Sequence, residues 1–229
     1  MRWRRRVLFF VALFFSFAAA PYAQAQIRIG EAAIVHNEVV NDATAGQINV
    51  GDNVMRDETV RTGADSAARL VMADSTNLSL GANATLKLDR SIFNDEHTYR
   101  DIAIRLASGA FRFVTGHSEK AAYKITTPLA TIGVRGTILD ILSERGRTTV
   151  VLQEGAASVC TLSFQCLDLT QPGDTAIITL TNGKVSIKKA SNPPWTFSAT
   201  CASAAGLCTV TDFADAGPSS DPNAMLCGR

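Results

Sequence analysis

The sequence has few of the residue types from which active sites are usually built. It contains three histidines and an aromatic fraction of only 7%, and many of its phenylalanines lie before residue 20. The histidines, His36, His97 and His117, are scattered, without the partner residues that a metal or acid–base site requires. It contains no Gly-x-Ser-x-Gly segment, the pattern that activates a serine. We therefore expect a noncatalytic protein with no cofactor and no metal site.

The sequence also gives little indication of a catalytic carboxylate pair or of a phosphate-binding loop. Asp65, Asp74 and Asp89 could converge in a fold, but each occupies a turn context in which aspartate is favoured for its backbone hydrogen bonds. The segment Gly133–Gly136 lacks the glycine spacing and the lysine followed by serine or threonine of a phosphate loop. An enzyme whose site is assembled from distant residues stays open as an alternative, and it requires a concave pocket with converging ionisable groups.

Long apolar runs are absent after the N-terminus. Met1–Arg6 contains four arginines, Val7–Ala20 is an almost wholly apolar run, and Ala23–Ala25 has the small-x-small pattern of a signal-peptidase site. We predict a cleavable signal peptide over residues 1–25, with cleavage before Gln26. The alternative is a membrane anchor, but about 14 apolar residues fall short of the roughly 20 that a spanning helix needs. An exported chain without a transmembrane segment is therefore expected.

An excess of positive charge is absent as well. Removing residues 1–25, which contain four arginines and no acidic residue, changes the formal net charge from +1 to −3. A nucleic-acid partner is therefore not expected. The remaining chain of about 200 residues is long enough to bury a full core.

Cysteines are confined to the C-terminal third of the chain. Cys160 and Cys166 enclose a short loop between two strand-like runs, and this arrangement favours a disulfide across a hairpin. The alternative is a metal site, but the spacing differs from that of a zinc knuckle and no histidine lies nearby. Cys201 and Cys208 are candidates for a second disulfide, which would leave Cys227 as the odd cysteine, either free or linked to another molecule.

Helical periodicity is scarce, and short extended segments alternate with turn signals. Leu78 and Leu80 lie two residues apart, as do Leu86 and Leu88, which places each pair on one face of a sheet. We predict an all-β fold, either a β-roll or a β-sandwich of short strands with some solenoid-like stacking, over residues 26–190. Within it, Ser108–Gly109 is predicted to turn the chain, and the polar segment Arg90–Tyr99 is predicted to be a surface loop.

The segment Thr126–Asp140 is the most informative part of the sequence. Pro128 holds its neighbour Thr127 extended, Gly133 and Gly136 permit unusual backbone angles, and several β-branched residues follow. This pattern predicts a strand, a sharp corner and another strand. Arg135, between the two glycines, has two interpretations: it binds an anionic ligand or a partner carboxylate, or it pins the corner to a nearby acidic residue.

Several segments, in order, resemble the FecR-domain family of periplasmic modules that were first associated with ferric-citrate signalling. The series covers residues 51–159, about half the chain. The similar segments are Val60–Ser66, with a Thr-Gly-x-x-Ser turn; Arg69–Thr76, with a turn similar to Asp-Gly-Thr; Leu78–Leu86; Leu106–Phe113; Thr126–Thr137; and Val150–Val159.

This resemblance implies a noncatalytic sensor or interaction module of the Gram-negative periplasm. It also implies contacts with an envelope protein, either a receptor or a regulator, through the family signature Thr127, Pro128, Gly133, Arg135, Gly136 and Thr137. Two departures matter. Ser75 stands where glycine is commoner in the family, and we expect no cytoplasmic segment of the kind with which signalling members control a sigma factor. An envelope glycan or polymer-binding module is the alternative; it would require exposed aromatic residues, for which Tyr99, Tyr123 and Trp195 are the candidates.

The C-terminal part beyond Val159 is predicted to add one hairpin and an extension. Asn182–Gly183 is suited to a tight turn between two strands. Residues 191–229 are expected to form a cysteine-containing, partly disordered extension. Its Trp195 and Phe197 either dock on a partner or fold back over the sheet.

Overall fold

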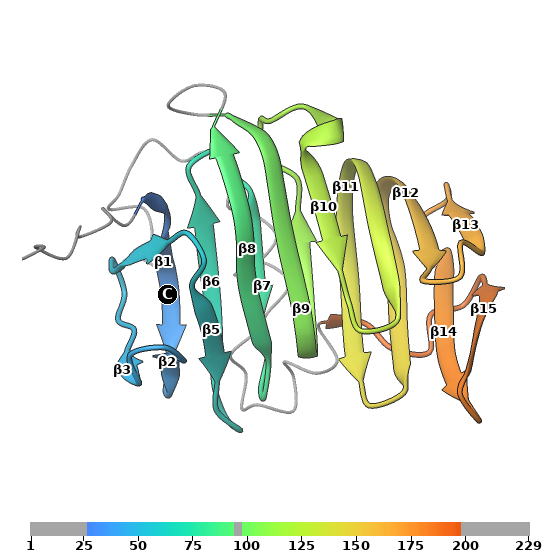
Figure 1. Ribbon diagram of the computed structural model, residues 1–229, viewed down its shortest axis with the longest axis horizontal. Helices are drawn as coiled ribbons and strands as arrows, with labels where there is room; N and C mark the ends of the chain where they lie inside the picture. Colours follow the sequence, from blue (N-terminus) through green and yellow to red (C-terminus); the bar gives the residue numbers. More distant parts are fainter. Residues whose placement is uncertain (1–26, 94–97, 198–229) are drawn as a thin grey trace, which may run out of the picture.

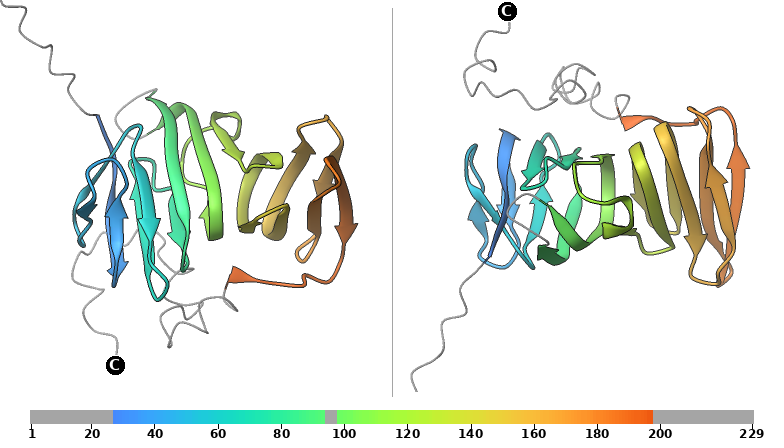
Figure 2. Two further views of the ribbon diagram at one scale, coloured as in Figure 1. Left: turned by 60° about the horizontal axis from the view of Figure 1, so that its bottom comes forward. Right: turned by 90° about the horizontal axis from the view of Figure 1, so that it is seen from above.

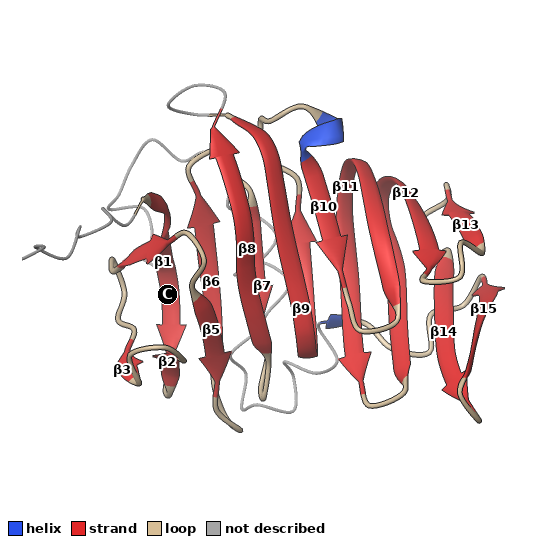
Figure 3. Cartoon of the chain, in the orientation of Figure 1, coloured by secondary structure: helices blue, strands red, loops and turns tan. Residues whose placement is uncertain are grey.

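The computed structural model describes residues 27–93 and 98–197, and the regular secondary structure of this part of the chain is almost wholly β-strand (Figures 1 and 3). All fifteen strands described belong to one hydrogen-bonded sheet. The all-β prediction is confirmed. The elements are β1 (Arg28–His36), β2 (Val39–Asn41), β3 (Gly46–Gln47), β4 (Asn53–Met55), β5 (Thr59–Thr62), β6 (Ala67–Met72), β7 (Asn77–Leu80), β8 (Thr85–Phe93), β9 (Tyr99–Val114), η1 (Lys120–Ala122), β10 (Tyr123–Thr126), β11 (Ala130–Glu144), β12 (Arg147–Thr161), β13 (Cys166–Leu169), β14 (Thr175–Thr181) and β15 (Lys184–Ala190).

The sheet is rolled into two layers that face each other across one core (Figure 2). The layer here called the β8 layer contains β3, β2, β5, β8, β10 and β13. The layer here called the β7 layer contains β4, β1, β6, β7, β14 and β15. The long strands β9, β11 and β12 contribute to both layers. The first part of β9, for example, pairs with β8 and β10, and its last part pairs with β7 and β11.

Each long strand passes from one layer to the other at a glycine with positive φ. The φ angles are 101° at Gly109, 62° at Gly136 and 82° at Gly155, a region in which other residues are strained. The bends are also crowded. A Cβ atom on Gly155 would lie 1.9 Å from the carbonyl oxygen of Gly136, and one on Gly109 would lie 2.4 Å from the Cα of Ala84. The tight backbone packing at these bends therefore requires glycine.

Alternation along the strands fills the space between the layers with apolar side chains. In the β8 layer, Ile102, Ile104 and Leu106 of β9 are fully buried or nearly so. In the β7 layer, Phe111 and Phe113 of the same strand are also buried, and the ring of Phe113 meets that of Tyr123 edge to face at 5.6 Å. Burying each such large side chain stabilises the fold by about 1.5–3 kcal/mol. One core therefore spans both layers.

Two local predictions differ from the structure. The turn expected at Ser108–Gly109 is a bend inside β9, because both sides of the bend stay paired with other strands. The loop expected over Arg90–Tyr99 is shorter, because β8 continues to Phe93, and Tyr99 already opens β9 and pairs with Phe93. Backbone pairing between the consecutive strands β8 and β9 outweighs the polar character of this segment.

The C-terminal hairpin and the first disulfide confirm their predictions. Asn182 and Gly183 connect β14 to β15 with φ angles of 51° and 75°, as a two-residue hairpin turn requires. Cys160 and Cys166 form a disulfide and are directly paired across β12 and β13. Cys201, Cys208 and Cys227 lie outside the described residues. Among those described, no helix has the length and apolar character needed to cross a bilayer.

The end of the described chain folds back over the outer face of the β7 layer. Phe197 is 1% exposed and packs with Ala67 and Ala110. Beneath it, Arg112 of β9 and Asp140 of β11 are paired across the strands, and their charged groups form two hydrogen bonds of 2.7 and 3.0 Å. The backbone N–H of Phe197 donates to the same carboxylate at 3.0 Å. Of the two fates considered for this aromatic residue, the structure shows the fold-back.

Candidate functional site

The first part of the family signature forms a tight turn between β10 and β11. The backbone N–H of Thr127 donates to the carbonyl oxygen of Ala130 at 2.8 Å. The Thr127 hydroxyl oxygen accepts the backbone N–H of Ala130 at 3.1 Å, and Thr148 of β12 donates to it at 3.3 Å. Thr127 is buried, whereas Pro128 is exposed at the tip of the turn. The role of Thr127 in the described structure is therefore to shape the turn.

The last part of the signature forms the bend of β11. The register with β12 shifts between Arg135 and Ile138, around the positive φ of Gly136. The Thr137 hydroxyl oxygen accepts the backbone N–H of Arg135 at 3.1 Å, and the N–H of Thr137 donates to the Thr115 hydroxyl at 2.8 Å. The predicted corner is therefore centred on Gly136 and fixed by threonine hydroxyls, while Gly133 lies in the straight part of the strand.

The middle of the signature opens onto a groove on the outer face of the β8 layer. Gly133, Arg135, Ala156 and Ser158 line it, with Asp168 on the far wall, and the space measures about 810 Å³. Gly133 has no positive φ, and a Cβ atom placed there would meet nothing within 4 Å. The fold itself therefore does not require glycine at this position, and the missing side chain keeps the groove deep.

Arg135 is the cationic group of this groove. Its side chain is exposed, and within the described residues it forms no ion pair. The interpretation that it pins the corner to an acidic residue therefore finds no partner there. A buried arginine–aspartate pair does exist in the fold, but it is formed by Arg112 and Asp140. The guanidinium of Arg135 is thus free to meet an anionic group of another molecule.

Comparison with known proteins identifies the domain that carries this signature. Residues 58–158 match the family model of the FecR protein. The chain contains a FecR domain. This agrees with the resemblance over residues 51–159 and places the groove residues of β11 and β12 inside or at the end of the FecR domain.

Similar solved structures include two crystal structures of a "putative anti-sigma factor" from Parabacteroides distasonis ATCC 8503. They are 17% and 16% identical to this chain, with TM-scores of 0.47 and 0.45. In both, the alignment covers 57% of this chain and 58% of the other, so the FecR-domain chain spans little more than half the length of these relatives. A search of curated proteins gives no significant match.

A buried carboxylate that sequence analysis treated as a turn residue ties together three parts of the FecR domain. Asp74 is fully buried and accepts hydrogen bonds from the hydroxyls of Tyr123 at 2.5 Å and Ser118 at 2.6 Å. Its other oxygen accepts the N–H of Thr76 at 3.0 Å. Burial, and then the bond to Asp74, raise the pKa of Tyr123 to about 12. The alternation of apolar residues could not reveal this link, because it joins parts of the chain that are distant in sequence.

The other candidate residues do not assemble into a site. Asp89 is held at the surface by Lys87 and Arg105, and the bond from Lys87 is the main reason why the pKa of Asp89 is lowered. Asp65 lies in a separate exposed turn. Across the described residues, no group of three metal-ligating side chains is found. His97 lies outside that part of the chain.

The aromatic platform expected of a glycan-binding module is not formed by the tyrosines proposed for it. Tyr99 and Tyr123 are 1% and 3% exposed, and both hydroxyls point to partners inside the domain. Burial raises the pKa of Tyr99 above its ordinary range. Trp195 packs beside Phe197 on the outer face of the β7 layer. These residues therefore offer no row of exposed rings.

Proposed function

We propose that this protein is a noncatalytic sensor or interaction module that takes part in envelope signal transduction in the periplasm. The FecR family match supports a regulatory role through protein contacts. The predicted signal peptide supports export. The observation that carries the proposal is the exposed guanidinium of Arg135 at the wall of a groove whose floor is Gly133. Both residues belong to the family signature, the guanidinium forms no ion pair within the described residues, and the described fold does not require glycine at position 133.

The groove fits an extended segment of a partner protein that carries a carboxylate. A guanidinium recognises a carboxylate through two parallel hydrogen bonds, and such charge-assisted bonds are stronger than neutral ones. Gly133 and Ala156 leave room for the partner backbone to approach the sheet closely. Lys124 of β10 is exposed and pairs with Gly133 across the strands, so a second cation borders the same surface. A partner carboxylate would therefore be favoured at the Arg135 and Lys124 side of the groove, whereas Asp168 lies on the opposite wall.

The test is site-directed photocrosslinking in cells that export the tagged protein. A photoreactive amino acid is placed at Ser158, inside the groove, and the crosslinked species are identified by mass spectrometry. We expect one discrete envelope protein, either a receptor or a regulator. Its yield should fall strongly in Arg135→Ala and partly in Arg135→Lys, because lysine keeps the charge but loses the paired hydrogen bonds.

The matched control is Arg145→Ala, which removes an exposed arginine from the β11–β12 hairpin, outside the groove. This variant should crosslink as the wild type does. Equal crosslinking yields for the Arg135 and Arg145 variants would show that Arg135 does not contribute to binding the partner. Retention of envelope polymer instead of a protein would replace this proposal with the polymer-binding alternative.

A further inference from the structure

The disulfide-closed loop between β12 and β13 presents two large apolar side chains to solvent. Phe164 is 89% exposed and Leu162 is 64% exposed. Among the other large apolar residues of the described chain, only Val50, also at 64%, is as exposed as Leu162. Isolated exposed apolar residues are common, but two within one five-residue loop form a small protruding patch. This patch is here called the Phe164 knob, and it consists of Leu162 and Phe164.

The backbone of the knob is held in an unfavourable conformation. Phe164 has a φ of 60°, in the left-handed region that glycine or asparagine adopts more readily than a bulky aromatic residue. Its ring gains no burial in return. An aromatic residue at a strained and exposed position suggests that its contacts lie outside the molecule.

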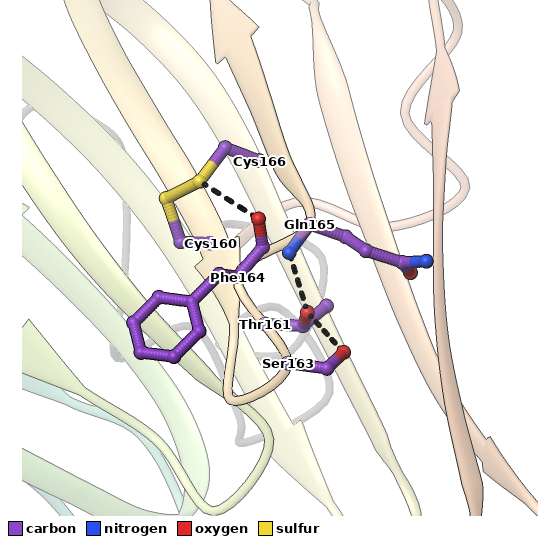
Figure 4. Close-up of a disulfide and its surroundings, with 6 residues drawn as sticks. All are labelled: Cys160, Thr161, Ser163, Phe164, Gln165 and Cys166. Atoms are coloured by element: carbon purple, nitrogen blue, oxygen red, sulfur yellow. Dashed lines mark hydrogen bonds between the residues drawn. A yellow bond between two sulfur atoms is a disulfide. The ribbon is translucent and has the colours of Figure 1, made fainter.

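The knob is also rigid. The disulfide closes the loop (Figure 4). Within the loop, the backbone N–H of Phe164 donates to the carbonyl oxygen of Thr161 at 3.0 Å. The backbone N–H of Gln165 donates to the Thr161 hydroxyl at 3.1 Å, and that hydroxyl also bonds Ser163 at 3.0 Å. Since the loop is ordered before any contact forms, docking it costs little conformational entropy.

The groove described above lies next to the knob on the same face of the β8 layer. Ser158 and Cys160 alternate with the buried Ala157 and Val159, so the groove floor and the disulfide share the outer face. The paired residues Ser158 and Asp168 are two positions from the paired cysteines, a separation of roughly 7 Å along the strand. A knob and a groove therefore stand side by side on one surface.

We propose that this surface pairs with the same surface of a second copy of the chain. In a dimer with two-fold symmetry, the Phe164 knob of each copy lies in the groove of the other copy. The two-fold axis then passes near the disulfide. Such a reciprocal contact is the geometry of an isologous interface. The groove, at about 810 Å³, is large enough for an aromatic ring. A second copy supplies both complements at once, and its knob would compete for the groove with the partner segment proposed above.

The charge of the loop argues against a lipid surface as the occupant. Residues 160–167 contain no charged side chain, and the nearest charge on β13 is the acidic Asp168. Stable docking on an anionic membrane takes a second signal such as a basic cluster beside the apolar tip, which this loop lacks. Two neutral loops can instead approach each other without repulsion.

Sedimentation velocity of the full chain, over concentrations reaching the high micromolar range, tests the proposal. We expect a reversible dimer whose dissociation constant rises at least about tenfold in Phe164→Ala, as removal of a central aromatic anchor does at interfaces. Gly133→Tyr should weaken the dimer equally by filling the groove. This substitution leaves the fold intact, because a Cβ atom at Gly133 meets nothing within 4 Å and tyrosine suits a strand. Val50→Ala, which removes an equally exposed apolar residue from the loop before β4, is the matched control and should not change the constant.

Mixing the two variants separates this arrangement from a general loss of association. Phe164→Ala keeps its groove and Gly133→Tyr keeps its knob, so a mixed dimer restores one of the two contacts and should associate more tightly than either variant alone. A mixture no tighter than the separate variants overturns the reciprocal dimer. The proposal is also overturned if the chain is monomeric at every concentration. It is likewise overturned if binding that depends on Phe164 appears only with phosphatidylglycerol vesicles. Circular dichroism of each variant confirms that it is folded.

Discussion

Removal of the Asp140 carboxylate should be among the most destabilising single changes in the domain. Asp140 is fully buried and accepts four hydrogen bonds: two from Arg112, one from Gln153 at 2.8 Å and one from the N–H of Phe197. Asp140→Ala leaves the guanidinium of Arg112 buried without its counter-charge, which costs about 3–5 kcal/mol. The buried N–H of Phe197 loses its acceptor as well, for about 1–3 kcal/mol more.

The expected loss in the free energy of unfolding is therefore about 4–8 kcal/mol, a large share of the roughly 5–15 kcal/mol that stabilise a domain. Urea denaturation followed by circular dichroism measures it, and the fluorescence of Trp195 reports on the covering segment in the same experiment. The double variant Arg112→Met/Asp140→Leu should regain most of the loss, because apolar residues of similar size replace both charges.

The control is Asp168→Ala, which removes an exposed carboxylate and should cost less than about 1 kcal/mol. An Asp140→Ala protein within 1 kcal/mol of the wild type, on the scale of an exposed pair, would refute the reasoning. A double variant as unstable as the single one would show that the loss comes from packing, not from the orphaned charge.

Three further predictions concern a strand bend, a turn and one ion pair. Gly155→Ala should lower the free energy of unfolding, measured by urea denaturation, by more than about 2 kcal/mol, because the added methyl group meets the carbonyl oxygen of Gly136. The control is Gly183→Ala, which has a similar φ of 75° but lies in open space, and it should lower the free energy of unfolding by only about 1 kcal/mol. Ser75→Gly should raise the melting temperature slightly, because Ser75 has a φ of 66°; an unchanged or lower value would show that its present turn carries no strain. The bond from Lys189 is the main reason why the pKa of Asp174 is lowered. This carboxylate therefore stabilises folding at pH values above its unfolded pKa of about 4. The stabilisation is lost as the pH falls through the lower pKa of the folded state. Asp174→Asn should therefore be less stable than the wild type at neutral pH and equal to it in acid; a gap that does not change with pH would contradict this assignment.

The parts of the fold that the sequence predicts correctly depend on local chemistry. Asn182–Gly183 permits the backbone angles of a tight hairpin, and the pair Cys160–Cys166 closes a loop that its flanking strands already bring together. The family signature follows the same rule, because its corner requires the positive φ of Gly136. In each case, neighbours in the chain determine the conformation.

The parts that sequence patterns miss depend on residues that are distant in the chain. The sequence predicts that Ser108–Gly109 turns the chain, yet pairing with four other strands keeps β9 continuous through the bend. The sequence pattern does not predict the pair of Arg112 and Asp140, because these side chains point to an outer face that only the returning C-terminal segment buries. The left-handed φ of Phe164 carries no sequence signal, since aromatic residues seldom adopt it.

The passage of β9, β11 and β12 through both layers has a mechanical consequence. Two layers that touch only through side chains can slide or part, as separate sheets in a sandwich do, at the cost of apolar contacts alone. Here three covalently continuous strands connect the layers, and the bends at Gly136 and Gly155 are in direct backbone contact. Separation of the two layers would have to break main-chain hydrogen bonds in both layers. A pull exerted on the outer face of one layer is therefore transmitted to the opposite face as movement of one stiff body.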